Sequence, residues 1–237
     1  MEFRQYTTNI AIVGMGGIGS HLLGALAAAL HKGPLSESLG GVRFHIFDSD
    51  LVDESNTMHQ RFAPRDVGRH KVEAMREALS PFTGGSLEIE AHPLDIRSSN
   101  DSDEYPMICF EESALVVVCV DSTEARRIAH SHRSPWLDLR CMGDGFVAID
   151  YRVEDETIGL LTIDQPPKSC QLEGAIETGN IQFGYFAAAA HGAQWVIQML
   201  RSMAGERGAM APLPASTSIT FGTLGRLPTK EEPVEVG

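Results

Sequence analysis

A glycine-rich loop near the N-terminus constrains the fold of this chain more than any other feature. Residues 14–19 read Gly-Met-Gly-Gly-Ile-Gly and match the pattern GxGxxG. The apolar run at 9–13 predicts a buried strand, and the Leu- and Ala-rich segment 18–30 predicts a helix. In this order the turn and the helix N-terminus present backbone NH groups to a phosphate. The expected nucleotide-binding glycines are Gly14, Gly16, Gly17 and Gly19.

Strand-like and helix-like segments alternate through the first half of the chain. Further strands are expected at 42–47, 86–92 and 114–120, and further helices at 68–79 and 124–132. This alternation is typical of an α/β fold with a doubly wound, mostly parallel, Rossmann-like sheet. The segment 32–41, with its Gly, Pro and Ser, is interpreted as a loop.

The second half predicts a mixed or antiparallel extension of the sheet. Its expected strands are 136–139, 145–151 and 159–162. A loop is expected at 165–178, followed by a long alanine-rich helix at 183–203. We therefore predict a single domain over residues 1–209 and a partly mobile tail over residues 210–237.

Composition excludes several classes of protein. The formal net charge of -13 argues against nucleic-acid binding, which needs clustered Lys and Arg. No apolar run reaches the ~18 residues of a membrane-spanning helix, so no membrane partner is expected. The N-terminus lacks the pattern of a signal peptide, which makes the cytoplasm the expected location.

The glycine loop alone does not distinguish between ligands, because nicotinamide enzymes, flavin enzymes and methyltransferases also use such loops. Asp48 ends the second predicted strand, where an acidic side chain can bind ribose hydroxyls. A turn without a ligand and a capping aspartate are the structural alternatives. More specific motifs are needed to identify the function.

Four further motifs supply that specificity. Residues 48–56 read Asp-Ser-Asp-Leu-Val-Asp-Glu-Ser-Asn, residues 60–61 read Gln-Arg, residues 66–71 read Asp-Val-Gly-Arg-His-Lys, and residues 119–122 read Cys-Val-Asp-Ser. In this order and spacing they resemble the ubiquitin-activating superfamily of the ThiF/MoeB/HesA type. The resemblance extends over roughly residues 9–205.

The resemblance implies an adenylyltransferase that uses ATP and Mg²⁺. A carboxylate attacks the α-phosphate, pyrophosphate leaves, and catalysis is mostly positioning and charge neutralisation. By resemblance, Asp48 holds the ribose, Asn56 and Lys71 lie along the phosphates, and Asp121 binds magnesium. One or two carboxylates together with phosphate oxygens are the usual magnesium ligands at a nucleotide.

The chain departs from the family pattern at two points. The family places Arg directly before Gln, but here His59 occupies that position and Arg61 follows Gln60. Either residue could replace the phosphate-contacting Arg, and we favour Arg61 as the catalytic one. The paired CxxC motifs that bind zinc in many members are missing, so no zinc is expected.

Cys170 is the expected thioester cysteine. It lies in the segment 165–172, where the family has its crossover loop, and Lys168 is near it in sequence. A thiolate is the reactive form, and a nearby cation favours it. An unreactive loop cysteine is the alternative, and Cys141, next to Arg140, is a second candidate.

Four functions are compatible with these residues. The first is adenylation of the C-terminal carboxylate of a ubiquitin-like protein, followed by thioester formation on Cys170 and transfer to a conjugating enzyme. The second is adenylation of a sulfur-carrier protein or a peptide without a thioester step. A nicotinamide-dependent oxidoreductase and a non-catalytic binding module are the third and fourth. The resemblance also implies a homodimer.

Overall fold

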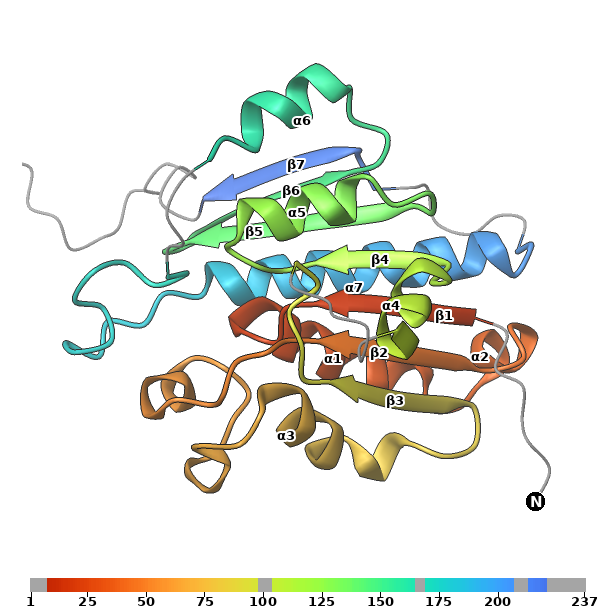
Figure 1. Cartoon of the computed structure of the whole chain (residues 1–237), viewed down its shortest axis with the longest axis horizontal. Coiled ribbons are helices and arrows are strands. Elements are labelled where there is room, and N and C mark those ends of the chain that lie inside the picture. The colour runs from red at the N-terminus through yellow and green to blue at the C-terminus, as the bar shows by residue number, and fades with distance from the viewer. Residues whose placement is uncertain (1–7, 98–103, 165–168, 207–212, 221–237) are drawn as a thin grey trace, which may run out of the picture.

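The chain folds around one seven-stranded sheet in the order β3-β2-β1-β4-β5-β6-β7 (Figure 1). The computed structural model describes residues 8–97, 104–164, 169–206 and 213–220. The strands are β1 (Thr8–Val13), β2 (Val42–Phe47), β3 (Leu87–His92), β4 (Leu115–Val118), β5 (Trp136–Met142), β6 (Gly145–Asp150) and β7 (Ser216–Thr220).

The sheet is mostly parallel with antiparallel pairing at its C-terminal strands, which confirms the predicted fold class. Strands β1 to β5 pair in parallel, whereas β6 pairs antiparallel with both β5 and β7. All four residues of β4 are buried, as expected for a central strand of a sheet covered on both faces. The order matches a doubly wound arrangement, in which the strand order reverses between the parallel neighbours β1 and β4.

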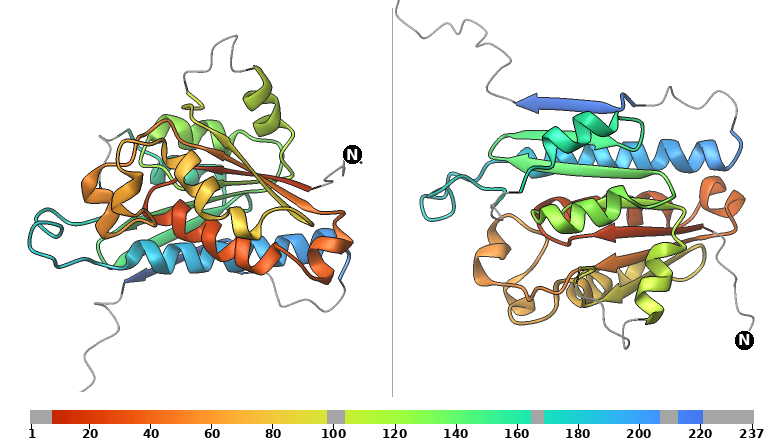
Figure 2. Two further views of the ribbon diagram at one scale, coloured as in Figure 1. Left: turned by 90° about the horizontal axis from the view of Figure 1, so that it is seen from below. Right: turned by 45° about the horizontal axis from the view of Figure 1, so that its top comes forward.

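Helices cover both faces of the sheet (Figure 2). The first face packs against α1, α3 and α7, and the second packs against α4 and α5. The α-helices are α1 (Gly17–Leu30), α2 (Pro34–Ser38), α3 (Lys71–Ala78), α4 (Glu104–Glu111), α5 (Thr123–His130), α6 (Asp155–Leu161) and α7 (Gly184–Met203). Short 3-10 helices are η1 (Glu54–Met58), η2 (Pro64–Asp66) and η3 (Ser80–Phe82).

Helix α7 is the longest helix among the described residues, and it packs along α1. Gly192 on α7 has no room for a side chain, because a Cβ there would lie 2.5 Å from a methyl carbon of Leu139 on β5. Small residues therefore bring α7 close to the sheet, as its alanine-rich sequence predicts. No helix within the described residues is both long and apolar enough to cross a membrane.

Two predictions of secondary structure are wrong. The segment 32–41 contains α2, which starts with Pro34 at its first position, where proline's fixed φ suits a helix. The expected strand at 159–162 is instead the end of α6, which has Asp155 and Glu156 in its first turn. Acidic side chains there stabilise the positive end of the helix dipole, whereas the short apolar run alone suggested a strand.

Two elements were not predicted. Helix α4 covers the β2–β3 side of the second face, and β7 adds an antiparallel strand to β6. Strand β7 lies within the segment 210–237 that the sequence assigned to a tail, so the sheet continues beyond residue 209. Residues 207–212 and 221–237 lie outside the described residues.

Candidate functional site

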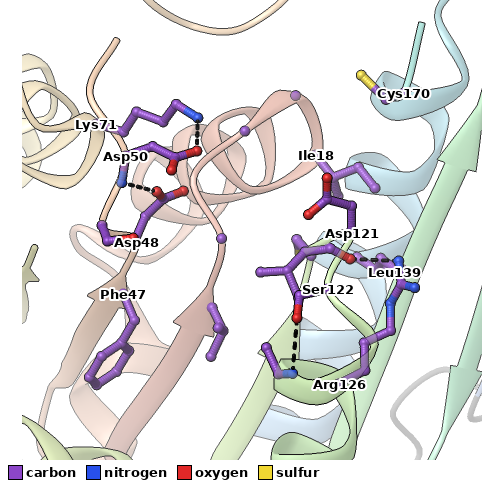
Figure 3. A pocket seen from close by; sticks show the side chains of 18 of the residues that line it. Ile18, Phe47, Asp48, Asp50, Lys71, Asp121, Ser122, Arg126, Leu139 and Cys170 are labelled. Atoms are coloured by element: carbon purple, nitrogen blue, oxygen red, sulfur yellow. Dashed lines mark hydrogen bonds and ion pairs between the residues drawn. The ribbon is translucent and has the colours of Figure 1, made fainter. Parts of the chain in front are cut away.

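A pocket opens where the strand order reverses, between β1 and β4, at the carboxyl ends of the strands. In open α/β sheets this is the place where ligands bind. It is lined by the glycine loop, the segment after β2, Lys71 of α3, the segment after β4, and Cys170. Figure 3 shows Asp48, Asp50 and Lys71 on one side of the glycine loop and Asp121 and Cys170 on the other.

Glycine is required at different positions of the loop for different structural reasons. Gly14 has φ of +94°, a conformation that L side chains rarely adopt. A Cβ at Gly19 would lie 1.9 Å from the Gly14 carbonyl oxygen, so Gly19 allows the strand and helix to pack closely. Gly16 lines the pocket, and a Cβ there would meet no atom within 4 Å. The loop therefore leaves open space above Gly16, as a phosphate cradle requires.

Asp48 is held in place by two backbone NH groups. Its Oδ2 accepts a hydrogen bond of 2.7 Å from Met15 N in the glycine loop, and its Oδ1 accepts one of 2.8 Å from Asp50 N. Burial raises the pKa of the Asp48 carboxyl, while Lys71 and the two hydrogen bonds oppose that shift. This carboxylate is thus tied to the loop and faces the pocket as a fixed acceptor.

Lys71 is buried at the first turn of α3, which is unusual for lysine. Only 7% of the residue is exposed, and its Nζ donates to Asp50 Oδ2 at 2.8 Å. Its backbone NH donates to the Asp50 carbonyl at 3.0 Å. These contacts hold an ammonium group at the pocket wall, in a position to neutralise negative charge on a bound group.

Asp121 lies three residues after the end of β4, on the other side of the loop (Figure 3). It is exposed in the pocket, and Ser122 after it caps α5 by accepting a hydrogen bond of 3.3 Å from Ala125 N. Arg97 donates to Ser122 Oγ at 3.1 Å and is paired with Asp95. Asp121 is therefore a carboxylate of the pocket that interacts electrostatically with Arg97 and Arg126.

A buried cation, Arg126 of α5, lies beneath this side of the pocket. Its guanidinium donates to the Val120 carbonyl at 2.5 Å and lies 3.6 Å from Asp138 Oδ1. Asp138 is fully buried and also contacts His130 at 3.0 Å and Arg140 at 2.6 Å. Burial would raise the pKa of Asp138, but the hydrogen bonds from His130 and Arg140 and the nearby guanidinium groups hold it below its usual value.

Cys170 lies beside the glycine loop. A Cβ on Gly17 would be 3.3 Å from its sulfur, so the sulfur sits at the N-terminal turn of α1. A hydrogen bond with Cys141 lowers the pKa of Cys170 to about 5; burial opposes the shift and His59 reinforces it. The same hydrogen bond and burial raise the pKa of Cys141. Cys170 is therefore the thiolate of the pair, and Cys141 is the thiol that donates to it.

The segment that bears Cys170 is anchored by backbone and amide contacts. Gly143 N donates to the Cys170 carbonyl at 2.8 Å. The Gln171 side chain donates to the Gln182 carbonyl at 2.8 Å and accepts from Gln182 N at 2.9 Å. Residues 169–178 contain no helix or strand, as predicted, yet these contacts fix the cysteine over the pocket. Lys168 lies outside the described residues.

Two predicted side chains do not line the pocket. The Arg61 guanidinium packs on α1, where a Cβ at Gly24 would be 2.7 Å from its Nη1. The Asn56 side chain accepts a hydrogen bond of 3.0 Å from Asp53 N and closes the capping box of η1. His59, which the sequence left as the alternative to Arg61, is buried and does line the pocket.

Sequence reasoning missed three arginines that line the pocket, Arg97, Arg126 and Arg140. Arg126 is five positions after Asp121, on the helix that Asp121 precedes, and the family motifs cover none of the three. Only the rotation of α5 and the direction of β5 place the side chains of Arg126 and Arg140 at the pocket. An Arg near the start of the helix after a motif aspartate is the one signal that could have found Arg126.

Comparison with known proteins agrees with this geometry. The family model described as "ThiF family" matches residues 5–216. "Ubiquitin-like modifier-activating enzyme 5" of Drosophila virilis is 32% identical over 124 residues, which are 49% of this chain and 28% of the fly protein. The Drosophila mojavensis protein of the same name is 32% identical over 125 residues, with the same shares. The match thus covers well under two thirds of the length of each of these relatives.

Solved structures share the fold. The crystal structure of Escherichia coli MccB with ATP has a TM-score of 0.59 and 18% identity, and the match covers 90% of this chain and 60% of that one. PaaA has a TM-score of 0.58 and 17% identity, over 93% of this chain and 62% of that one. The family match spans most of the chain, including the glycine loop, both sides of the pocket and Cys170. The chain belongs to the ThiF family.

Proposed function

We propose that this protein adenylates the C-terminal carboxylate of a ubiquitin-like protein and then takes the acyl group onto Cys170. One observation carries the proposal: the Cys170 sulfur lies beside Gly17 of the glycine loop, in the same pocket as Asp48, Lys71 and Asp121. An activated carboxylate made at the loop would therefore form next to a thiolate. A nicotinamide-dependent oxidoreductase needs neither the buried lysine nor this cysteine.

The pocket fits ATP. The space above Gly16 is a cradle that a Cβ would fill, and the N-terminus of α1 points its NH groups there. Asp48, fixed by Met15 N, is placed to accept hydrogen bonds from ribose hydroxyls. Lys71 would exchange part of its contact with Asp50 for a phosphate oxygen, with little movement of its buried stem.

Asp121 would hold the Mg²⁺ ion, which supplies charge neutralisation on the phosphates. Arg126 adds a buried positive charge below the same edge and keeps Asp138 ionised. Arg61 and Asn56 have no direct contact with substrate in this proposal. Asn56 shapes the turn between β2 and α3, and Arg61 packs on α1, so His59 is the residue of that motif that faces the pocket.

The two chemical steps balance without a further reactant. A carboxylate oxygen of the substrate attacks the α-phosphorus of ATP, the bond to the β-phosphate breaks, and pyrophosphate leaves. The Cys170 thiolate then attacks the acyl carbon, the bond to the AMP oxygen breaks, and AMP leaves with the electron pair. The Cys141 thiol stabilises the thiolate by its hydrogen bond before the attack.

The proposal includes partners that follow from the chemistry. A ubiquitin-like protein would insert its C-terminal tail, because the carboxylate must reach the pocket. A conjugating enzyme would accept the acyl group from Cys170, and a homodimer is the assembly that the family resemblance implies.

The decisive experiment uses the purified chain, a candidate ubiquitin-like protein and ATP with Mg²⁺. Pyrophosphate exchange that depends on the candidate's C-terminal carboxylate measures the first step. A conjugate that dithiothreitol cleaves, seen on a non-reducing gel, measures the second. Both signals are expected for the wild type, and Cys170→Ala should keep the exchange and lose the conjugate.

The other outcomes lead to other functions. Exchange without a conjugate in the wild type would favour an adenylyltransferase for a sulfur-carrier protein or a peptide. A thermal shift with NAD, and none with ATP and Mg²⁺, would overturn adenylation. If ATP binds but no substrate polypeptide supports exchange, the chain is a binding module. A conjugate that persists in Cys170→Ala but disappears in Cys141→Ala would transfer the thioester role to Cys141.

A further inference from the structure

A second cluster of reactive side chains lies outside the nucleotide pocket, on the face of β2 and β3 that α4 covers. Strand register creates it, because His45 pairs with Glu90 across β2 and β3, and His92 follows two residues later on the same face. Helix α4 covers that face and brings a cysteine to it. We name this group the edge cluster; its members are His45, Glu90, His92 and Cys109.

The ligand atoms of the edge cluster converge. Each side chain offers one metal-binding atom, and all four atoms lie within 4.8 Å of one another. His45 Nδ1 lies 3.1 Å from His92 Nε2 and 3.5 Å from Glu90 Oε2. Ligand atoms around a tetrahedral zinc ion, with bonds of about 2.0–2.3 Å, are about 3.3–3.8 Å apart. The cluster therefore needs only small adjustments to hold such an ion.

Burial also suits a metal. His45, His92 and Cys109 are 1%, 5% and 7% exposed, so three of the four ligands are shielded from water. A thiolate is the metal-binding form of cysteine, so metal binding must displace the proton of Cys109.

Charges around the edge cluster balance a divalent cation. The carboxylate of Glu90 and the thiolate of Cys109 would neutralise it. Arg43, the cation next to the cluster, binds Glu88 Oε2 at 2.9 Å and Glu90 Oε1 at 3.3 Å. This second contact orients Glu90 so that its other oxygen, Oε2, faces His45. Outer contacts of this kind commonly orient metal ligands.

Three competing contacts must break. The Tyr105 hydroxyl of α4 donates to Glu90 Oε2 at 2.9 Å and also hydrogen-bonds Cys109. Tyr105 is 58% exposed, so its hydroxyl can turn to water when a metal binds. The third contact is the hydrogen bond between His45 Nδ1 and His92 Nε2, which a metal between the two nitrogens would replace.

We propose that the edge cluster binds a zinc ion that fixes α4 to the edge of the sheet. A mixed set of nitrogen, sulfur and carboxylate ligands with four-coordinate spacing is typical of zinc. The absence of CxxC pairs predicted no zinc, but that reasoning considers cysteines close in sequence. These ligands come from two strands and a helix, and only the strand register and α4 bring them together. This inference does not depend on the proposed adenylation.

Cobalt(II) binding tests the site directly. The full chain, stripped with a chelator, is titrated with Co²⁺ and its absorption spectrum is recorded. We expect one ion per chain, intense visible bands of tetrahedral geometry and a thiolate-to-cobalt band in the near ultraviolet. Zinc should displace the cobalt. Zinc at 100 times its dissociation constant should raise the melting temperature by about 5–10 °C.

Matched variants distinguish this site from the other cysteines and histidines. Cys109→Ala should abolish the thiolate band, whereas Cys170→Ala should keep it. His92→Gln should weaken cobalt binding at least tenfold, whereas His132→Gln, at another buried histidine, should not. Tyr105→Phe should bind at least as tightly as the wild type. Near-ultraviolet circular dichroism of the metal-free variants checks their folding, and His92→Gln serves as the test if Cys109→Ala fails to fold.

Two results would overturn the proposal. One is a wild-type protein that shows no thiolate-to-cobalt band and no zinc-dependent change in melting temperature. The other is a band that persists in Cys109→Ala and disappears in Cys170→Ala, which would place the metal at the nucleotide pocket.

Discussion

The sulfur of Cys170 lies against Gly17 at the first turn of α1, where any Cβ would come within 3.3 Å of it. The positive end of the helix dipole therefore faces a thiolate as well as the phosphate cradle. The pocket thus combines a site for making an activated carboxylate with a nucleophile that can attack it.

Cys170 should react as a thiolate well below neutral pH. Its pKa of about 5 predicts that its alkylation rate with iodoacetamide changes by less than about twofold between pH 6 and 8. An ordinary cysteine with a pKa near 8.5 speeds up by roughly 100-fold over that range. The rate of Cys170 should fall only as the pH drops through 5. Peptide mass spectrometry after timed alkylation gives the rate for each cysteine.

The hydrogen bond from Cys141 is the largest cause of that shift, so its removal is the sharpest control. Cys141→Ala should slow the alkylation of Cys170 at pH 6 by about tenfold or more, because the pKa rises. Cys119→Ala, another thiol that lines the pocket, should leave the rate unchanged. A Cys170 rate that climbs with pH like that of an ordinary thiol would contradict this account.

Asp121 should be essential for adenylation although it is exposed. Removing one charge-stabilising group from such a site costs roughly 2.7–4 kcal/mol in the transition state, so Asp121→Ala should slow pyrophosphate exchange about 100-fold or more. Glu124→Ala is the matched control, since Glu124 is an exposed acid three residues later that does not line the pocket. Equal exchange by the two variants would remove Asp121 from the mechanism.

Lys71, on the other side of the pocket, should also be essential for adenylation. Lys71→Ala should lower exchange to a similar extent, because the buried ammonium group is the cation held at the wall beside Asp50. Lys32→Ala, at an exposed lysine after α1, should not change it. Unchanged exchange in Lys71→Ala would mean that this lysine is structural.

The parts of the fold that sequence predicts are those that depend on local patterns. The run that became β4 is continuously apolar, residues 10–13 of β1 are apolar, and β2 is rich in aromatic and β-branched residues. The glycine loop follows β1 directly, so the position of the pocket follows from topology. Asp48 comes directly after β2 and Asp121 lies three residues after β4, so topology places both at the sheet's carboxyl edge. The sequence could therefore predict that both aspartates lie at the pocket.

The remaining features depend on contacts between distant residues. His45 and His92 are 47 positions apart and meet only because β2 and β3 pair in one register. Arg126 reaches the pocket only through the rotation of α5, and Arg61 turns away because Gly24 leaves space on α1. Helix α6 was mistaken for a strand because seven residues are too few to show a helical period.

The buried charges beneath the pocket should contribute more to the free energy of unfolding than exposed ion pairs do. Asp138→Asn leaves Arg126 and Arg140 without their buried counter-charge. Because breaking a buried ion pair commonly costs about 3–5 kcal/mol, we expect the free energy of unfolding at pH 7 to fall by about that amount. Because the folded-state pKa of Asp138 is lowered, its contribution is complete above the unfolded pKa and is lost as the pH falls through the folded pKa. Urea denaturation at pH 7 measures the difference in free energy of unfolding.

The control is an aspartate in an exposed pair. Asp164 contacts Arg127 at 2.9 Å with 79% of its side chain exposed, so Asp164→Asn should change the free energy of unfolding by less than about 1 kcal/mol. If Asp138→Asn and Asp164→Asn lower the free energy of unfolding by the same small amount, the buried network does not hold β4, β5 and α5 together as the contacts indicate.

Two alanine substitutions in the glycine loop should separate binding from folding. A Cβ at Gly16 meets no atom within 4 Å but enters the phosphate cradle, so Gly16→Ala should weaken ATP binding about tenfold or more. Its cost in stability should stay below about 1 kcal/mol, the scale of a poorer helix cap. A Cβ at Gly19 would lie 1.9 Å from the Gly14 carbonyl oxygen, so Gly19→Ala should destabilise the fold by about 1–3 kcal/mol or more. Calorimetric titration with ATP and Mg²⁺, paired with urea denaturation, measures both quantities. A Gly16→Ala protein that binds ATP like the wild type would place the phosphates elsewhere in the pocket.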